Sequence, residues 1–258
     1  MTKISIENGN VIIPEGITEI NSDTFTDEIK KKMKRVVIPS TVTEIGYYAF
    51  YSCENLTSIE IPSSVKIIDA GAFECCRNLT SVKLPNSIKV IDHLTFFGCI
   101  SLTSIEIPDS VTEIGGCAFS RCTSLKSIKL PNSVTLIRGG AFSYCTNLTN
   151  INIPNSVTII ENLAFSHCTN LKSIEIPESV EDFFMDSFSG CEKLHTINFM
   201  GFVKNITNGY MESVKMFYKS DKNHLKKILV PASTGYIYKR RFVKELRLIV
   251  EEKSPVKQ

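Results

Sequence analysis

The chain has 258 residues, of which 43% are hydrophobic and 22% charged, and it contains no Trp. This composition is that of a foldable protein and indicates neither a disordered chain nor a membrane protein. The net charge of +2 conceals an asymmetry, because residues 200–258 carry 13 Lys and Arg against 5 Asp and Glu, whereas residues 1–199 carry 16 against 22. We therefore expect a mildly acidic body with a basic C-terminal end.

The sequence shows neither a membrane segment nor a secretion signal. No apolar run approaches the roughly 18 residues that cross a bilayer, and residues 1–20 lack the basic-then-apolar layout of a signal peptide. The odd number of cysteines, nine, and their apolar surroundings indicate free thiols in a reducing compartment. We expect an intracellular protein without a membrane segment.

Cysteines and prolines recur every 23 residues. A fixed period of roughly 20 to 50 residues is typical of a solenoid built from stacked coils. The positions that follow this period are Cys53, Cys76, Cys99, Cys122, Cys145, Cys168 and Cys191, and Pro39, Pro62, Pro85, Pro108, Pro131, Pro154 and Pro177.

The period also divides the chain. Residues 1–38 are predicted to form an N-terminal capping coil, in which Pro14 precedes Pro39 by 25 residues because a basic insertion lies in TDEIKKKMKR. Seven regular repeats are expected over residues 39–199. The remaining residues, 200–258, are predicted to form a degenerate coil and a basic C-terminal cap.

Each repeat begins with a short predicted strand. In L-x-x-I-x-I/L-P the last positions alternate, so Ile59 and Ile61 are expected to face inward and Ser58 and Glu60 outward. Proline cannot donate a ladder hydrogen bond, so Pro62 should end the strand.

The second half of each repeat is expected to form the other sides of the coil. The next pair, V-x-x-I, fits either an extended segment or a helical turn. In A-F-x-x-C the Phe and the Cys are predicted to share the inner face of a helical turn. Only stacking would then close the core, because one coil alone does not offset its ordering entropy.

The complete unit, I-P-x-S-V-x-x-I-x-x-x-A-F-x-x-C-x-x-L-x-x-I, resembles the BspA-type leucine-rich repeat over about residues 11–199. A column of Ser stands where that repeat class usually has Asn or Cys, and its hydroxyls are expected to bond backbone groups as the chain turns. The resemblance implies an α/β repeat solenoid: a right-handed coil with a parallel sheet of short strands on one face and short helical or extended turns on the other. The column is Ser64, Ser87, Ser110, Ser133, Ser156 and Ser179.

The C-terminal end also resembles that family. Residues 225–250 are similar to its last coil, so a helix over 236–245 and a closing strand over 246–250 are expected. Residues 200–223 lack the Pro, the Cys and the A-F pair, and they are either a degenerate coil or an insertion. The resemblance implies a binding surface without enzymatic activity, used in adhesion or interaction.

A solenoid binds through the outward residues of its strands, so two columns are the candidate partner-binding face. One alternates in charge over four coils. Neighbouring strands lie about 4.8 Å apart, so the alternation predicts lateral ion pairs that set the register of the stack, with a charged partner surface as the alternative. The other is a ladder of small polar groups without aromatic anchors. The charged column is Glu60, Lys83, Glu106, Lys129, Asn152, Glu175 and Asn198, and the polar column is Ser58, Ser81, Ser104, Ser127, Asn150, Ser173 and Thr196.

The sequence contains no pattern of reaction chemistry. One Cys per coil does not converge on a metal as a zinc site requires, so the thiols are expected to be core filler. The four histidines fall on different repeat positions, and neither a catalytic triad nor a phosphate-binding Gly motif is present. We expect no catalytic residues, no metal and no cofactor.

Two basic clusters lie near the ends of the array. We expect them to be polar caps that stop further stacking, with an acidic protein as an alternative partner; nucleic acid is disfavoured because base-reading or stacking groups are not evident. The clusters are Lys30, Lys31, Lys32, Lys34 and Arg35 near the start and Lys239, Arg240, Arg241, Lys244 and Arg247 near the end.

These observations favour a non-enzymatic scaffold that presents its strand face to a protein partner. The alternatives are a structural component that self-associates or joins an assembly through its basic end, and a surface adhesin if the chain is exported. The sequence identifies neither the partner nor the oligomeric state.

Overall fold

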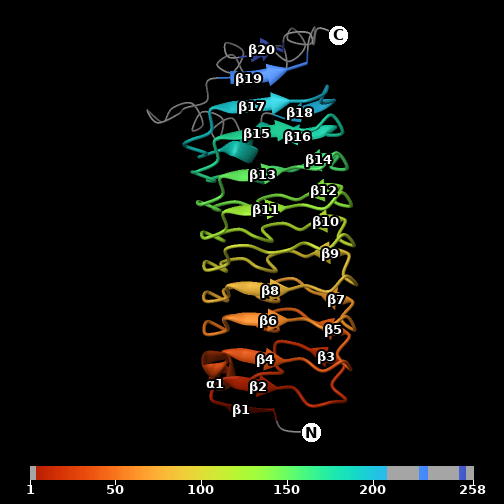
Figure 1. The fold of residues 1–258 in the computed structure, drawn as a ribbon, viewed down its shortest axis with the longest axis vertical. Helices are drawn as coiled ribbons and strands as arrows, with labels where there is room; N and C mark the ends of the chain where they lie inside the picture. The colour runs from red at the N-terminus through yellow and green to blue at the C-terminus, as the bar shows by residue number, and fades with distance from the viewer. Residues whose placement is uncertain (1–3, 208–226, 232–249, 254–258) are drawn as a thin grey trace.

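The computed structural model describes residues 4–207, 227–231 and 250–253, and in these residues the chain winds into a stack of coils (Figure 1). Each coil runs through a long strand, a proline corner, a short strand and a turn segment. Within the described residues the helices are α1 (Asp27–Lys32) and the 3-10 helix η1 (Met185–Phe188), and no described helix is long and apolar enough to cross a membrane. The predicted solenoid is confirmed.

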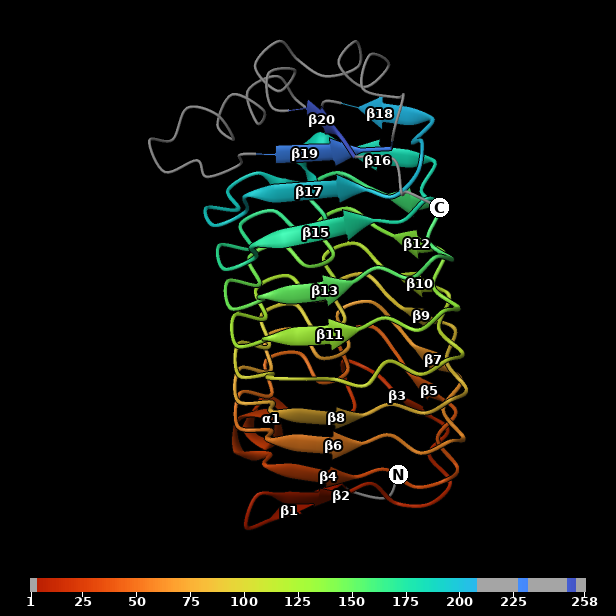
Figure 2. The same cartoon turned by 45° about the horizontal axis from the view of Figure 1, so that its top comes forward.

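The long strands stack in parallel on one side of the solenoid (Figure 2), which we call the strand face. Only β1 departs, because it pairs antiparallel with β2 and so forms a hairpin at the N-terminal end. One coil contributes a single bridge, from Glu106 to Lys129, instead of a strand. The strands are β1 (Ser5–Glu7), β2 (Asn10–Ile12), β4 (Arg35–Val37), β6 (Ser58–Glu60), β8 (Ser81–Lys83), β11 (Ser127–Lys129), β13 (Asn150–Asn152), β15 (Ser173–Ile176), β17 (Thr196–Phe199), β19 (Lys227–Val230) and β20 (Val250–Glu252).

The V-x-x-I segments are extended, which decides between the two predicted conformations. Their last residues form short parallel strands, such as β5 paired with β7 through Ile45 and Ile68. Every second side chain is buried, as the burial of Ile68 beside the exposed Ile67 shows. The strands are β3 (Glu19–Ile20), β5 (Glu44–Ile45), β7 (Ile67–Ile68), β9 (Val90–Ile91), β10 (Glu113–Ile114), β12 (Leu136–Ile137), β14 (Ile159–Ile160), β16 (Asp182–Phe184) and β18 (Asn205–Thr207).

The A-F-x-x-C segments bury both the Phe and the Cys, as predicted, but they form turns rather than a helical turn. Two positions of each segment recur with left-handed backbone, for example Tyr48 at φ 53° and Ser52 at φ 54°. The amide of Phe50 donates to the carbonyl of Ala72 in the next coil at 2.8 Å. Because the amide bonds between coils, it is not available to close a helix.

The core is a column of parallel phenylalanine rings with a column of thiols beside it. Successive rings from Phe50 to Phe188 stack with centroids 5.1 to 5.7 Å apart. The thiol of Cys76 donates to the carbonyl of Phe50 at 3.1 Å, and the same bond recurs in the next five coils. The cysteines therefore fill space, as predicted, and also satisfy a buried carbonyl in the preceding coil.

The ends of the stack depart from the period. The two extra residues of the N-terminal coil are taken up by α1, where Thr26 Oγ1 accepts from the amide of Ile29 at 3.3 Å. Towards the C-terminus, Thr196 pairs with Lys227, a separation of 31 residues that exceeds the period of 23 by eight.

Residues 200–223 were predicted to be either a degenerate coil or an insertion, and of these the structure describes residues 200–207. Residues 205–207 continue the short-strand sheet as β18, and the extra length falls between β18 and β19. A closing strand, β20, pairs with β19 in parallel at Val250–Glu252. The helix predicted over 236–245 and residues 246–249 of the predicted strand lie outside the described residues.

Candidate functional site

The strands place both predicted columns on the outer side of the strand face. Ile59 is buried between Ser58 and Glu60, and the same alternation recurs along the stack. In the polar column every residue is exposed except the half-buried Ser58 and Thr196, and in the charged column every residue is exposed except the half-buried Asn198. The two columns therefore form a long, flat polar surface.

The charged column forms lateral contacts at its two ends. Lys83 Nζ lies 2.5 Å from Glu60 Oε1, which is the ion pair that the alternating signs predict. Asn198 Nδ2 donates to Glu175 Oε1 at 3.1 Å. Glu106 and Lys129 are linked through their backbones by an isolated bridge, and no ion pair connects these two described side chains. Their charges are therefore open to a partner.

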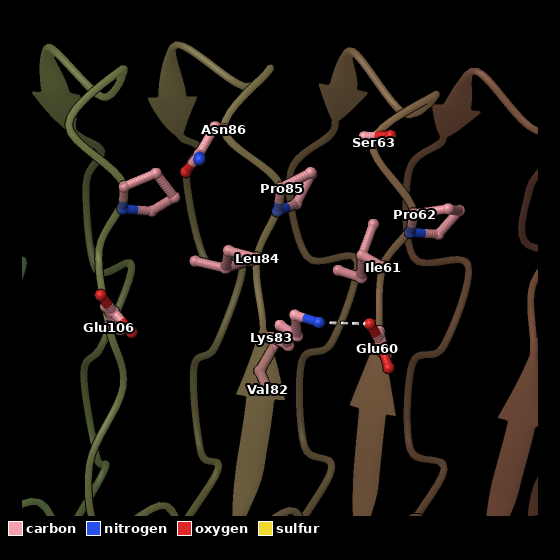
Figure 3. Close-up of a pocket in the computed structure, with 11 residues that line it drawn as sticks. Glu60, Ile61, Pro62, Ser63, Val82, Lys83, Leu84, Pro85, Asn86 and Glu106 are labelled. Atoms are coloured by element: carbon pink, nitrogen blue, oxygen red, sulfur yellow. Dashed lines mark hydrogen bonds and ion pairs between the residues drawn. The ribbon is translucent and has the colours of Figure 1, made fainter.

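A groove lies where the strand face ends at the proline corner (Figure 3). Its volume is about 590 Å³. The rings of Pro62 and Pro85 lie side by side on successive coils and, with the half-buried Leu84, form an apolar floor. Glu60 and Lys83 border this floor on the strand side.

The far rim of the groove consists of short polar side chains. Ser63 and Asn86 follow the prolines of two successive coils and border the floor opposite the charged column (Figure 3). Amide side chains both donate and accept hydrogen bonds, so this rim can bond the backbone of a bound chain.

The groove continues along the proline corner. A second cavity of about 490 Å³ shares Asn86, Glu106 and Pro108 with the first and adds Asp109. A third, of about 460 Å³, lies further along the stack between Asn132 and Asn155 around Pro154. We call this series the proline groove. The proline column was visible in the sequence, but a groove beside it was not predicted.

The serine column that was expected to bond backbone groups stabilises this corner. The hydroxyls of Ser133, Ser156 and Ser179 donate to valine carbonyls of the preceding coil at 2.5 to 2.7 Å, and that of Ser87 does the same. The corner is thus rigidly joined from coil to coil. The hydroxyls of Ser64 and Ser110 are buried without such a bond in the described residues.

The first basic cluster belongs to the N-terminal coils. Lys32 forms an ion pair with Glu28 at 2.7 Å, and Lys30 Nζ donates to the carbonyl of Ser22 at 3.0 Å. Asn55 Nδ2 donates to the carbonyl of Lys31 at 2.6 Å. Part of this cluster is thus engaged in local contacts that hold α1 to the stack. The second basic cluster, Lys239 to Arg247, lies outside the described residues.

The thiol column is buried, and burial keeps its thiols in the protonated form at neutral pH. Burial raises the pKa of Cys53, Cys145 and Cys191 to about 12, so these thiols remain protonated. Among the described residues, no group of three or more His, Cys, Asp and Glu side chains is placed to hold a metal ion.

Several aromatic residues that lie outward on the turn segments were not predicted from the sequence. Tyr47, Tyr48, Tyr51 and Tyr144 have 61%, 41%, 43% and 40% of their surface exposed. They do not share one repeat position, so a search for regular columns does not find them. The glycines of the same segments, such as Gly98 at φ +71°, mark the turn conformation and were the available signal.

Comparison with known proteins agrees with this architecture. A family model described as the BspA-type leucine-rich repeat region matches in six copies over residues 3–124, 91–217 and 124–249. No curated protein matches the chain.

Among solved structures, a leucine-rich repeat protein from T. pallidum is 33% identical, with 74% of this chain and 86% of that chain covered and a TM-score of 0.61. A leucine-rich repeat protein from Bacteroides ovatus is 26% identical, with 90% and 71% covered and a TM-score of 0.55. One from Eubacterium ventriosum is 22% identical over 88% and 75% with a TM-score of 0.53, a likeness that concerns the fold alone.

Proposed function

The chain belongs to the BspA-type leucine-rich repeat family, and we propose that it is a non-enzymatic scaffold that binds a protein partner along its strand face and proline groove. Leucine-rich repeat proteins commonly bind protein partners, and their fold is typically not enzymatic. The observation that carries the proposal is the proline groove, because it combines an apolar floor with polar rims over several coils.

An extended segment of a partner fits the shape and chemistry of this groove. Apolar side chains of the segment would cover the rings of Pro62 and Pro85, while its backbone amides and carbonyls bond Ser63 and Asn86 on the rim. The groove follows the stack axis, so the segment would cross the coils rather than run parallel to one strand.

The charges of the strand face would select the partner. Glu106 and Lys129 are exposed and not ion-paired with one another, so they can pair with charges of a partner. Exposed pairs contribute little affinity but fix register, and they weaken as salt is added. Because none of the described residues in the two columns is aromatic, we expect binding that is spread over many contacts and is sensitive to salt.

Affinity purification from the native cell with quantitative mass spectrometry tests the proposal, using the full chain. The decisive variant reverses the charged column with E60K, K83E, E106K and K129E, which keeps the net charge and allows the pair between positions 60 and 83 to form with opposite polarity. A protein that binds the wild-type chain through this face should be lost from the variant.

The matched control reverses two charges on the turn segments instead, with E74R and R121E. The control should retain the partner, and both variants should melt at the wild-type temperature, because all the substituted side chains lie outside the core. Retention of every captured protein by the strand-face variant would refute the proposal.

A further inference from the structure

The outward side of the turn segments carries large aromatic residues, which are absent from the two columns of the strand face, together with an arginine. We define the turn face as the outward residues that follow each core Phe or precede each core Cys. Its large members are Tyr51, Glu74, Phe97, Arg121, Tyr144 and His167. Tyr and Arg are the residues that concentrate binding energy in protein interfaces.

Four of these side chains form a continuous stack along the turn face. The guanidinium of Arg121 lies 5.9 Å from the ring centroid of Phe97 and 5.2 Å from that of Tyr144. Tyr144 in turn stacks on His167 at 4.3 Å with the ring planes 9° apart. Arg121 is exposed, and among the described residues it forms no ion pair. Its charge is therefore held in a fixed position without a carboxylate partner.

The backbone beneath this stack is unfavourable for the residues that occupy it. Arg121, Tyr144 and His167 have φ values of 62°, 58° and 56°, in the left-handed region. Gly98 and Gly190 occupy the same repeat position at φ 71° and 72°. A non-glycine residue there costs roughly 1 to 2 kcal/mol. Large side chains are thus present where glycine would be the more stable choice, which points to a use for them at the surface.

The turn face is self-complementary about the coil that contains Phe97. One coil towards the N-terminus lies Glu74, and one coil towards the C-terminus lies Arg121. Two coils away in the same directions lie Tyr51 and Tyr144. Tyr51, Glu74 and Phe97 share the position after the core Phe, whereas Arg121 and Tyr144 share the position before the core Cys. A two-fold axis through the coil of Phe97 therefore places Glu74 of one copy opposite Arg121 of the other. It likewise places Tyr51 opposite Tyr144.

We propose that this turn face binds a second copy of the chain in an antiparallel, two-fold symmetric dimer. Arg121 of each copy pairs with Glu74 of the other, Tyr144 packs on Tyr51, and the two Phe97 rings meet near the axis. Such an interface is isologous, so every contact occurs twice. Rings on both sides of the guanidinium would shield the ion pair from water.

The electrostatics of the single chain agree with this pairing. Glu74 is half-buried and has no ion pair in the described residues. Burial raises the pKa of its carboxyl, against a smaller opposing effect of His93. The other arginines near the turn face are paired: Arg77 with Glu54 at 3.6 Å, and Arg138 with two glutamates at 2.7 and 3.1 Å.

A single-stranded nucleic acid is the less suitable occupant of this stack. Such ligands require a groove of cations that follows the phosphates as well as rings that stack on the bases. Among the described turn-face residues from Tyr51 to His167, Arg121 is the one arginine without an ion pair. The balance of Glu74 against Arg121 instead suits a partner with the same two charges in reversed order.

Sedimentation velocity of the full chain over a concentration series tests the dimer. The wild-type chain should show a monomer–dimer equilibrium that weakens as salt is added. E74R and R121E should each weaken dimerisation roughly tenfold or more, because each creates two like-charge contacts in the symmetric interface. The double variant should dimerise again, and an equimolar mixture of the two single variants should form a heterodimer.

The control variant E106K/K129E changes the strand face and should leave dimerisation unchanged. A chain that is monomeric at every concentration would overturn the proposal, as would a dimer that is insensitive to both turn-face reversals or sensitive to the strand-face control. Circular dichroism of each variant verifies the fold. Loss of partner capture by the strand-face variant is a separate readout, so the two proposals fail independently.

Discussion

The buried Phe and Cys columns and the turn face belong to the same segments but follow opposite rules. From Phe50 to Phe188 the ring recurs at every coil, and each core Cys from Cys76 onward donates to a Phe carbonyl. The residue directly before each core Cys changes almost every time: Ser52, Cys75, Gly98, Arg121, Tyr144, His167 and Gly190.

The difference follows from the number of neighbours. An inward side chain is enclosed by the coils before and after it. Its size is therefore limited by the equivalent side chains of the two neighbouring coils. An outward side chain meets solvent on one side and is free to vary. The period therefore specifies the fold, and specificity lies in positions that do not follow it.

The largest expected effect is on the inward side. Phe119 is completely buried between Phe96 and Phe142, with ring centroids at 5.4 and 5.5 Å. Phe119→Ala should lower the free energy of unfolding by about 3 to 5 kcal/mol, because the ring column on both sides prevents the cavity from closing. Urea unfolding monitored by circular dichroism measures this.

The matched control is Phe97→Ala in a neighbouring coil, measured at low protein concentration. Phe97 is half-buried on the turn face, so its loss should cost much less than that of Phe119. Equal losses at the two positions would contradict the distinction between the core and the turn face.

A smaller effect per residue is expected from pH, and it again separates inward from outward residues. Burial raises the pKa of Cys145 to about 12 from the ordinary value of 9.0. Above pH 9 the unfolded chain loses thiol protons that the folded chain retains, so stability falls as pH rises and is fully present below pH 9. Each such thiol should contribute a loss of about 1.4 kcal/mol per pH unit between these two values.

Urea midpoints at about pH 8 and 10, in reducing buffer, measure this dependence. Cys145→Ala should flatten it, whereas Cys75→Ser should change it less, because the Cys75 thiol is half-exposed. A midpoint that is constant over this range would show that the thiols are not shielded as the structure indicates.

The sequence predicted the parts of the fold that repeat. Inward placement of Ile59, Ile61 and Phe73 followed from their spacing, and all three are buried. Spacing alone left the V-x-x-I segment undecided, because a separation of three suits both a helical turn and a short extended segment. The extended conformation is stabilised by pairing between neighbouring coils, as Ile45 pairs with Ile68. The sequence of a single repeat does not contain that information.

The surface was predicted less well for a related reason. The outward columns of the strand face were visible because Glu60 and Lys83 share one position. The proline groove depends on how successive coils align around Pro62 and Pro85, and the sequence does not show that alignment. The turn face was not predicted because no other coil has an arginine at the position of Arg121. The residue type therefore does not recur with the period.

The smallest expected effects lie at the position before the core Cys and should have opposite signs at two of its members. Ser52 has φ 54°, and none of its side-chain atoms forms a hydrogen bond among the described residues, so Ser52→Gly should stabilise the chain by roughly 1 kcal/mol. Gly98 has φ +71°, and an added Cβ would meet Cys75 Sγ at an ordinary 3.4 Å. Gly98→Ala should therefore destabilise by a similar amount through backbone strain alone. Urea unfolding measures the change in stability of both variants. Changes of equal sign would show that the left-handed backbone carries no energetic cost at this position. Arg121, Tyr144 and His167 would then no longer be residues retained for their side chains at the expense of stability.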